Sequence, residues 1–277
     1  MGSAPSSLTS ARRRNGAAQA KLPDIWLETP SQTFVARHDA RDADDAERVL
    51  AQLEHARAAL ERRLDVTLGA LDVVLHPSPA QLDAAQPWLA VQRRLTAPAA
   101  RRYVVGWAGE RELHVLSPRL LAQRASNVEG SLEMLMLAPS ALLARHALAR
   151  RHPGFPPPLG PLRLRRWMRA AWFVEGGAQW LSGQTRHVRP AVARRLHEGA
   201  KPAFPPKPAD ALLLGGTVFD LLAREEGERA AVAAARAGAE SLLADGFHGR
   251  GVRRTEDAWR SHLARLADAS AVPRRRR

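Results

Sequence analysis

Apolar and polar residues near the start of the chain follow two different periods. Residues 33–39, TFVARHD, have the composition of a short strand. Residues 42–65 carry apolar side chains at helical spacing, and acidic residues gather in the first turn of that segment. The pattern therefore predicts a strand followed by an amphipathic helix, with Asp42 as the residue that caps the helix.

Three further strands are expected before residue 130. ALDVVLHPSP, residues 70–79, predicts a strand that ends at Pro77. RRYVVGWA and RELHVLSP predict a pair of strands joined by Gly109 and Glu110. From Ser131 onward every long segment has a helical period, interrupted by two proline-rich loops. The predicted fold class is α+β, a small N-terminal sheet with a packed helix followed by a mainly helical part.

The same pattern divides the chain into four parts. We expect a disordered basic tail over residues 1–21, an N-terminal α/β part with an edge strand over 22–130, a helical part over 131–268 and a second basic tail over 269–277. No apolar run is long enough to cross a membrane, and residues 1–20 lack the apolar core of a secretory signal. We therefore expect a cytoplasmic protein without a membrane partner.

Composition limits the chemistry that the chain can perform. It has no cysteine, so thiolate nucleophiles, thiolate metal sites and disulfides are excluded. The formal net charge is +14, which suggests a polyanion partner, but the basic residues are mostly arginine in an alanine-rich chain. Nucleic-acid binding is therefore kept only as an alternative function. Phosphate-loop, dinucleotide and serine-hydrolase motifs are absent from the sequence.

One acidic residue lies in a stretch that otherwise resembles a buried helix. The segment WFVEGGAQWLSG, residues 172–183, places Trp172, Glu175 and Gln179 on one helical face. Gly176 and Gly177 cost helix stability, about 1 kcal/mol each relative to alanine, so close approach of another helix is expected there. The plainest explanation of Glu175 is a carboxylate that reaches solvent or pairs with an arginine.

This segment resembles the W-x-x-E-G-x-A-x-[WY] motif of peptidase-MA-like gluzincin metallopeptidases. Two later segments also resemble that family, GGTVFDLLAREEG and TEDAWRSHLARL, so that the likeness extends over residues 30–268. The resemblance implies a zincin-like fold in which Glu175 corresponds to the third zinc ligand. It also implies an H-E-x-x-H helix about 25 residues upstream.

The upstream helix departs from the family motif. Its best match is His146, which keeps the first histidine, followed by Ala147 in place of the general base and Arg150 in place of the second histidine. Arginine has no lone pair to give a cation, and alanine cannot take a proton from water. Together with Glu175 these positions form a vestigial active site with no catalytic residue. No metal is expected, because His146 and Glu175 alone are too few ligands.

Three functions follow as hypotheses. The favoured one is a catalytically silent gluzincin homologue with a peptide-binding or scaffolding role, and ELHVLSP is the edge strand expected to bind an extended peptide. The alternatives are an active zinc peptidase with unusual ligands, for which His114, His152 and His187 are weak candidates, and a basic nucleic-acid binder. The oligomeric state is left open.

The lost metal also raises the question of what neutralises the carboxylate. We expect a salt bridge between Arg150 and Glu175, with Arg145 or Arg169 as competitors, because a buried acid needs a cationic or donating partner. We also expect the Glu175 helix to run beside the helix of His146, with Gly176 or Gly177 near the contact.

Overall fold

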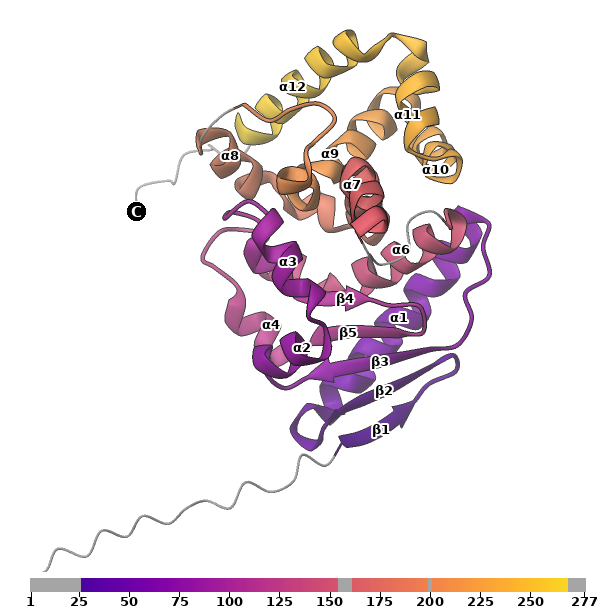
Figure 1. The fold of residues 1–277 in the computed structure, drawn as a ribbon, viewed down its shortest axis with the longest axis vertical. Coiled ribbons are helices and arrows are strands. Elements are labelled where there is room, and N and C mark those ends of the chain that lie inside the picture. The colour runs from indigo at the N-terminus through magenta and orange to yellow at the C-terminus, as the bar shows by residue number, and fades with distance from the viewer. Residues whose placement is uncertain (1–25, 154–160, 199–200, 269–277) are drawn as a thin grey trace, which may run out of the picture.

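The computed structural model of the chain describes residues 26–153, 161–198 and 201–268. The two basic tails of the sequence prediction lie outside the described residues. The described chain forms an N-terminal mixed sheet and a mostly helical remainder, which is the predicted α+β class (Figure 1). None of the described helices is both long and apolar enough to span a bilayer.

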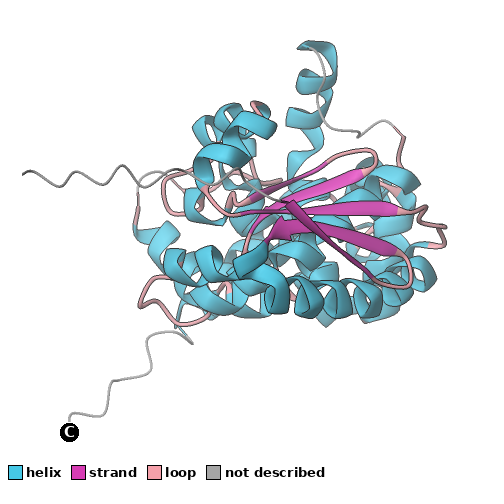
Figure 2. Cartoon of the chain, turned by 90° about the horizontal axis from the view of Figure 1, so that it is seen from below, coloured by secondary structure: helices cyan, strands magenta, loops and turns pink. Residues whose placement is uncertain are grey.

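A five-stranded sheet forms the N-terminal part, in the order β1-β2-β3-β5-β4. The three inner strands β2, β3 and β5 run parallel, while β1 and β4 are antiparallel edge strands. The strands lie side by side in Figures 1 and 2. Their bounds are β1 Trp26–Pro30, β2 Phe34–Asp39, β3 Leu71–His76, β4 Gly106–Ala108 and β5 Glu112–Leu116.

Two features of the sheet differ from the sequence prediction. The strand ELHVLSP was expected at the edge, but β5 lies between β3 and β4, so its hydrogen-bonding groups face two neighbours. The edge strand β4 is only three residues long and all three are buried. The other edge is β1, a strand that the sequence reading missed, with Trp26 and Leu27 each 40% exposed.

Helix α1, Ala43–Leu64, packs along one face of the sheet and confirms the predicted amphipathic helix. Its apolar stripe meets the inward residues of β2 and β3, such as Phe34 and Val73. Asp42 stands at the N-cap position, but its side chain makes no capping hydrogen bond. The carboxylate instead lies 3.3 Å from the Nε atom of Arg119, so the expected cap is wrong.

The remaining chain is helical, as the period after Ser131 predicted. Two short helices lie between β3 and β4 and one follows β5, while the helices after residue 160 form the upper part of Figure 1. Their bounds are α2 Pro79–Ala85, α3 Trp88–Leu95, α4 Pro118–Arg124, α5 Ser131–Met136, α6 Ala138–Arg151, α7 Pro161–Ser182, α8 Arg189–His197, α9 Pro208–Glu226, α10 Glu228–Ala237, α11 Ala239–Asp245 and α12 Val252–Asp268.

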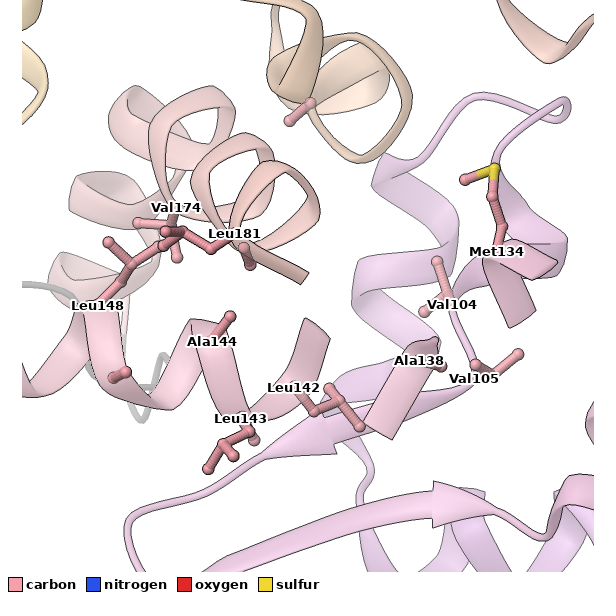
Figure 3. Close-up of a cluster of buried hydrophobic side chains, with 14 of the residues drawn as sticks. Val104, Val105, Met134, Ala138, Leu142, Leu143, Ala144, Leu148, Val174 and Leu181 are labelled. Carbon is pink, nitrogen blue, oxygen red and sulfur yellow. The ribbon is translucent and has the colours of Figure 1, made fainter. Parts of the chain in front are cut away.

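One hydrophobic cluster connects the sheet with the helical part. It includes Leu71 and Val115 from the sheet, Leu148 from α6 and Phe173 from α7. Figure 3 shows members of the cluster from α6, α7 and the segment before β4. Helix α6 therefore belongs to both halves, since it packs against α1 and the sheet on one side and α7 on the other.

Helix α7 crosses its neighbours at paired glycines. A Cβ atom on Gly176 would stand 2.2 Å from the carbonyl carbon of Gly215 in α9, and one on Gly177 would stand 3.0 Å from Leu148 in α6. The two backbones of α7 and α9 thus touch directly, which explains why the sequence accepts glycine in both helices. The expectation that α7 runs beside α6 with a glycine at the contact is confirmed.

Candidate functional site

Glu175 lies in the middle of α7 and is almost completely buried, with 5% of its surface exposed. Oxygen Oε1 is 3.2 Å from Nη2 of Arg145, which projects from α6. No described donor forms a hydrogen bond with that oxygen. The indole N–H of Trp167 likewise has no hydrogen-bond acceptor among the described residues. The carboxylate is therefore held by charge attraction rather than by a directed hydrogen bond.

Arg145 is the partner that the structure gives to Glu175, so the expected bridge from Arg150 is wrong. Arg150 is exposed, whereas Arg145 is 7% exposed and its guanidinium carbon lies 5.1 Å from the centre of the Trp107 ring. Residues 145 and 150 are five positions apart, a rotation of about 140° around the helix axis. The face that meets Glu175 is consequently a different face from the one assumed in the sequence motif.

Burial raises the pKa of the Glu175 carboxyl above its ordinary value. The Arg145 guanidinium and the Trp167 N–H oppose this rise, in that order, but do not overcome it. A carboxylate moved out of water loses more solvation than one imperfectly oriented cation returns. Burial thus disfavours the charged form of the Glu175 carboxyl, although the guanidinium of Arg145 lies beside it.

A small cavity of about 40 Å³ adjoins the ion pair. This volume exceeds what one water molecule needs but is far below the size of a peptide side-chain pocket. Its walls come from α3, α6, α7, α9, the segment before β4 and the short 3₁₀ helix after α7. They include Gln92, Tyr103, Gln179 and Gln184. Gln92 Oε1 and Gln179 Oε1 are buried without a donor, so the cavity wall has acceptors to offer.

Three of these polar residues were missed in the sequence. Gln92, Tyr103 and Gln184 lie far from Glu175 along the chain and follow no shared motif, so only the fold brings them together. Gln179 was placed on the face of Glu175, and it does line the cavity one turn further along α7. Its side-chain amide donates to the carbonyl of Leu212 in α9.

The other proposed site residues point elsewhere. His146 donates from Nδ1 to the carbonyl of Gly109, in the turn between β4 and β5, at 3.0 Å. Burial lowers the pKa of His146 below its usual value, and the Gly109 carbonyl only partly compensates. Ala147 is fully buried in the hydrophobic cluster. The structure therefore brings neither residue to the cavity of Glu175.

The alternative histidines are also placed outside this cavity. His114 lies on β5, where its Nδ1 atom is 3.0 Å from Nε2 of His76. His152 Nε2 lies 2.8 Å from the carbonyl of Ala235, and His187 follows α7 in a short 3₁₀ helix. Within residues 26–153, 161–198 and 201–268 no three His, Asp or Glu side chains are arranged to hold a metal ion.

Comparisons with known proteins add no relative. The chain matched no protein-family model, no curated protein and no solved structure. Its functional assignment therefore rests on its own residues and geometry.

Proposed function

We propose that this protein is a catalytically silent homologue of gluzincin metallopeptidases, in which a fixed arginine replaces the metal beside the third-ligand glutamate. The observation that carries the proposal is the buried ion pair between Arg145 and Glu175. A guanidinium neutralises the carboxylate electrostatically, as a divalent cation would, but it cannot activate a water molecule.

The face of α6 toward Glu175 supports this proposal. It presents Ala141, Leu142 and Arg145 to the cavity, and none of these side chains has a lone pair that a metal could accept. Positions 141 and 145 are one helical turn apart, which is the spacing of two histidine ligands in a zinc helix. We accordingly place the degenerate motif at 141 and 145 rather than at His146 and Arg150.

A binding or scaffolding role fits the shape of the site better than turnover of a peptide. The cavity at Glu175 has room for water but not for a substrate, and all residues of the neighbouring edge strand β4 are buried. Among the described strands, β1 is the edge with exposed residues. We place an extended peptide partner at β1, because strand addition needs an accessible edge.

Zinc binding tests the assignment of the two facing positions. Purified wild-type protein should hold less than about 0.1 zinc per chain, because Glu175 alone is too weak a site. The double variant Ala141→His, Arg145→His supplies two imidazoles opposite Glu175 and should approach one zinc per chain. Adding Glu175→Ala to that variant should remove the metal again.

A matched control uses the same helix on the wrong face. The variant Ala147→Glu, Arg150→His completes the sequence motif after His146, and it should bind no more zinc than the wild type. Uptake by this control but not by the 141/145 variant would overturn the placement. Wild-type zinc near one per chain, lost with Glu175→Ala, would instead support an active zinc peptidase.

A further inference from the structure

A second and much larger cleft lies on another side of α7, with a volume of about 510 Å³. It is bounded by the first half of α7, the loop at Pro205 and the turn between α10 and α11. This volume falls within the range of small-molecule sites, whereas the cavity at Glu175 does not. We call it the arginine cleft after Arg166 and Arg169, which line it.

The two arginines of this cleft have no anionic partner among the described residues. They are three positions apart on α7, so both guanidinium groups project from the same side of the helix. Both are exposed, and no ion pair or hydrogen bond joins either of them to another described residue. Two adjacent cations on one side of the helix make the potential at the cleft positive, and a bound anion would be attracted to it.

The remaining walls fit a small organic ligand. Pro205 and Leu243 provide apolar surface, and Ser241 is a partly exposed hydroxyl that can donate a hydrogen bond. Glu240 is the one acid among the residues lining the cleft, and it is exposed at the wall. The formal charge of the lining is therefore +1, from two arginines and one glutamate, with His152 counted as neutral.

We propose that the arginine cleft binds a small organic oxyanion, held by Arg166 and Arg169 through its phosphate or carboxylate group. Guanidinium groups match both oxyanions through paired N–H donors. A second arginine one turn along the helix doubles the positive charge that faces the ligand. Pro205 and Leu243 would contact the carbon skeleton. The arginine cleft shares no lining residue with the cavity at Glu175. Its proposed ligand is therefore independent of the silent-peptidase proposal.

Titration calorimetry on the full-length protein at low salt tests the site, with pyrophosphate as the phosphate probe and citrate as the carboxylate probe. At least one probe should bind saturably, and the Arg166→Ala, Arg169→Ala variant should weaken that binding by at least about tenfold, as expected for loss of two charge-assisted contacts. The arm that binds more tightly identifies the oxyanion.

Arg165→Ala is the matched control, because Arg165 is an exposed arginine of the same helix that does not line the cleft. It should leave the affinity within about twofold, since a charge outside the cleft contributes only screened attraction. Equal losses in Arg165→Ala and in the double variant would reduce the effect to general surface charge and overturn the proposal. Absence of saturable binding by both probes would also overturn it.

Two further variants change the cleft without removing its arginines. Ser241→Trp fills the space and should abolish binding, whereas Glu240→Gln removes the opposing carboxylate and should tighten it. Unchanged affinity in Ser241→Trp would mean that the probe binds outside the cleft. These changes lie at partly or fully exposed positions, so a folded protein is expected in each case.

Discussion

Two buried arginine–carboxylate pairs join helices in this protein, and they differ in geometry. Arg195 of α8 meets Asp210 of α9 as a fork, with Nε to Oδ1 at 2.6 Å and Nη2 to Oδ2 at 2.8 Å. Arg145 of α6 approaches Glu175 through a single contact of 3.2 Å without hydrogen-bond geometry. The first pair satisfies both carboxylate oxygens, whereas the second leaves one oxygen without a directed donor.

The pKa directions follow this difference. The hydrogen bond to Asp210 raises the pKa of Arg195 further above its ordinary value. Burial raises the pKa of Glu175 despite Arg145, so the surroundings disfavour its charged form. Two directed hydrogen bonds offset the desolvation of the two charges, but a single poorly oriented contact does not. We interpret the first pair as a structural joint and the second as the remnant of a different site.

The largest expected effect is the loss of the structural joint. Arg195→Ala should lower the free energy of unfolding by about 4 kcal/mol, because it leaves Asp210 buried without a cation. The neighbouring Arg194→Ala is the control, since that side chain is 55% exposed and pairs with Glu198 on the surface. It should cost less than about 1 kcal/mol. Chemical denaturation of both variants measures the difference, and equal losses would contradict the comparison.

Breaking the second pair should cost less. Arg145→Ala should destabilise by about 2 to 3 kcal/mol, because Glu175 can escape part of the penalty by taking up a proton and Trp107 loses its cationic neighbour. Arg150→Ala, on the exposed side of the same helix, should change stability by less than about 0.5 kcal/mol. If thermal unfolding shows Arg150→Ala to be the more harmful change, the observed pairing is not the one in solution.

The pH dependence of stability separates the pairs further. The folded protein keeps the Glu175 proton to a higher pH than the unfolded chain, whose ordinary pKa is 4.5. Stability should therefore fall as pH rises from 4.5 through the raised pKa, with a slope of at most about 1.4 kcal/mol per pH unit.

Glu175→Gln should remove that contribution to the slope. The measurement is the difference in unfolding free energy between wild type and variant from pH 4 to pH 8. A difference that stays constant across this range would show that the carboxyl has an ordinary pKa. A difference that increases in favour of the wild type would reverse the sign of the argument.

The smallest expected effect comes from Trp167→Phe, which keeps the ring but removes the N–H near Glu175. Stability should change by less than about 1 kcal/mol, since one weakly oriented donor is lost. The pH at which the Glu175 slope ends should move upward, because that N–H lowers the pKa of the carboxyl. Trp88→Phe is the control, because Trp88 lines a neighbouring small cavity together with Trp167. It should leave the pH dependence of stability that comes from Glu175 unchanged.

The sequence predicted those helices and strands whose apolar residues follow a regular local period. Helix α1 and strands β2, β3 and β5 agree with their apolar patterns, because each pattern is local. The same reading missed β1, since WLETP is mostly exposed and lacks the alternation of a buried strand. It placed β5 at the edge because strand order depends on pairing between distant segments, which no local pattern contains.

The candidate site shows the same division. Glu175 and the close approach at its glycines could be predicted, because an acid and two glycines contradict the surrounding helix pattern. The partner of Glu175 could not be predicted, because Arg145 and Arg150 both lie in the second half of α6. Only the rotation of α6 decides which of them faces α7. The arginine cleft has no sequence signature, since its walls come from four separate segments.

The contact between Gly176 and Gly215 also helps to keep Glu175 buried. With no side chains at the crossing, α9 lies directly on α7 and covers the helix beside Glu175. A single methyl group at Gly176 would act as a wedge, because its carbon would overlap the backbone of α9 and force the helices apart. The gap would hydrate the carboxylate and return its acidity toward that of a surface residue. The burial of Glu175 thus depends on two missing side chains as well as on the groups that surround it.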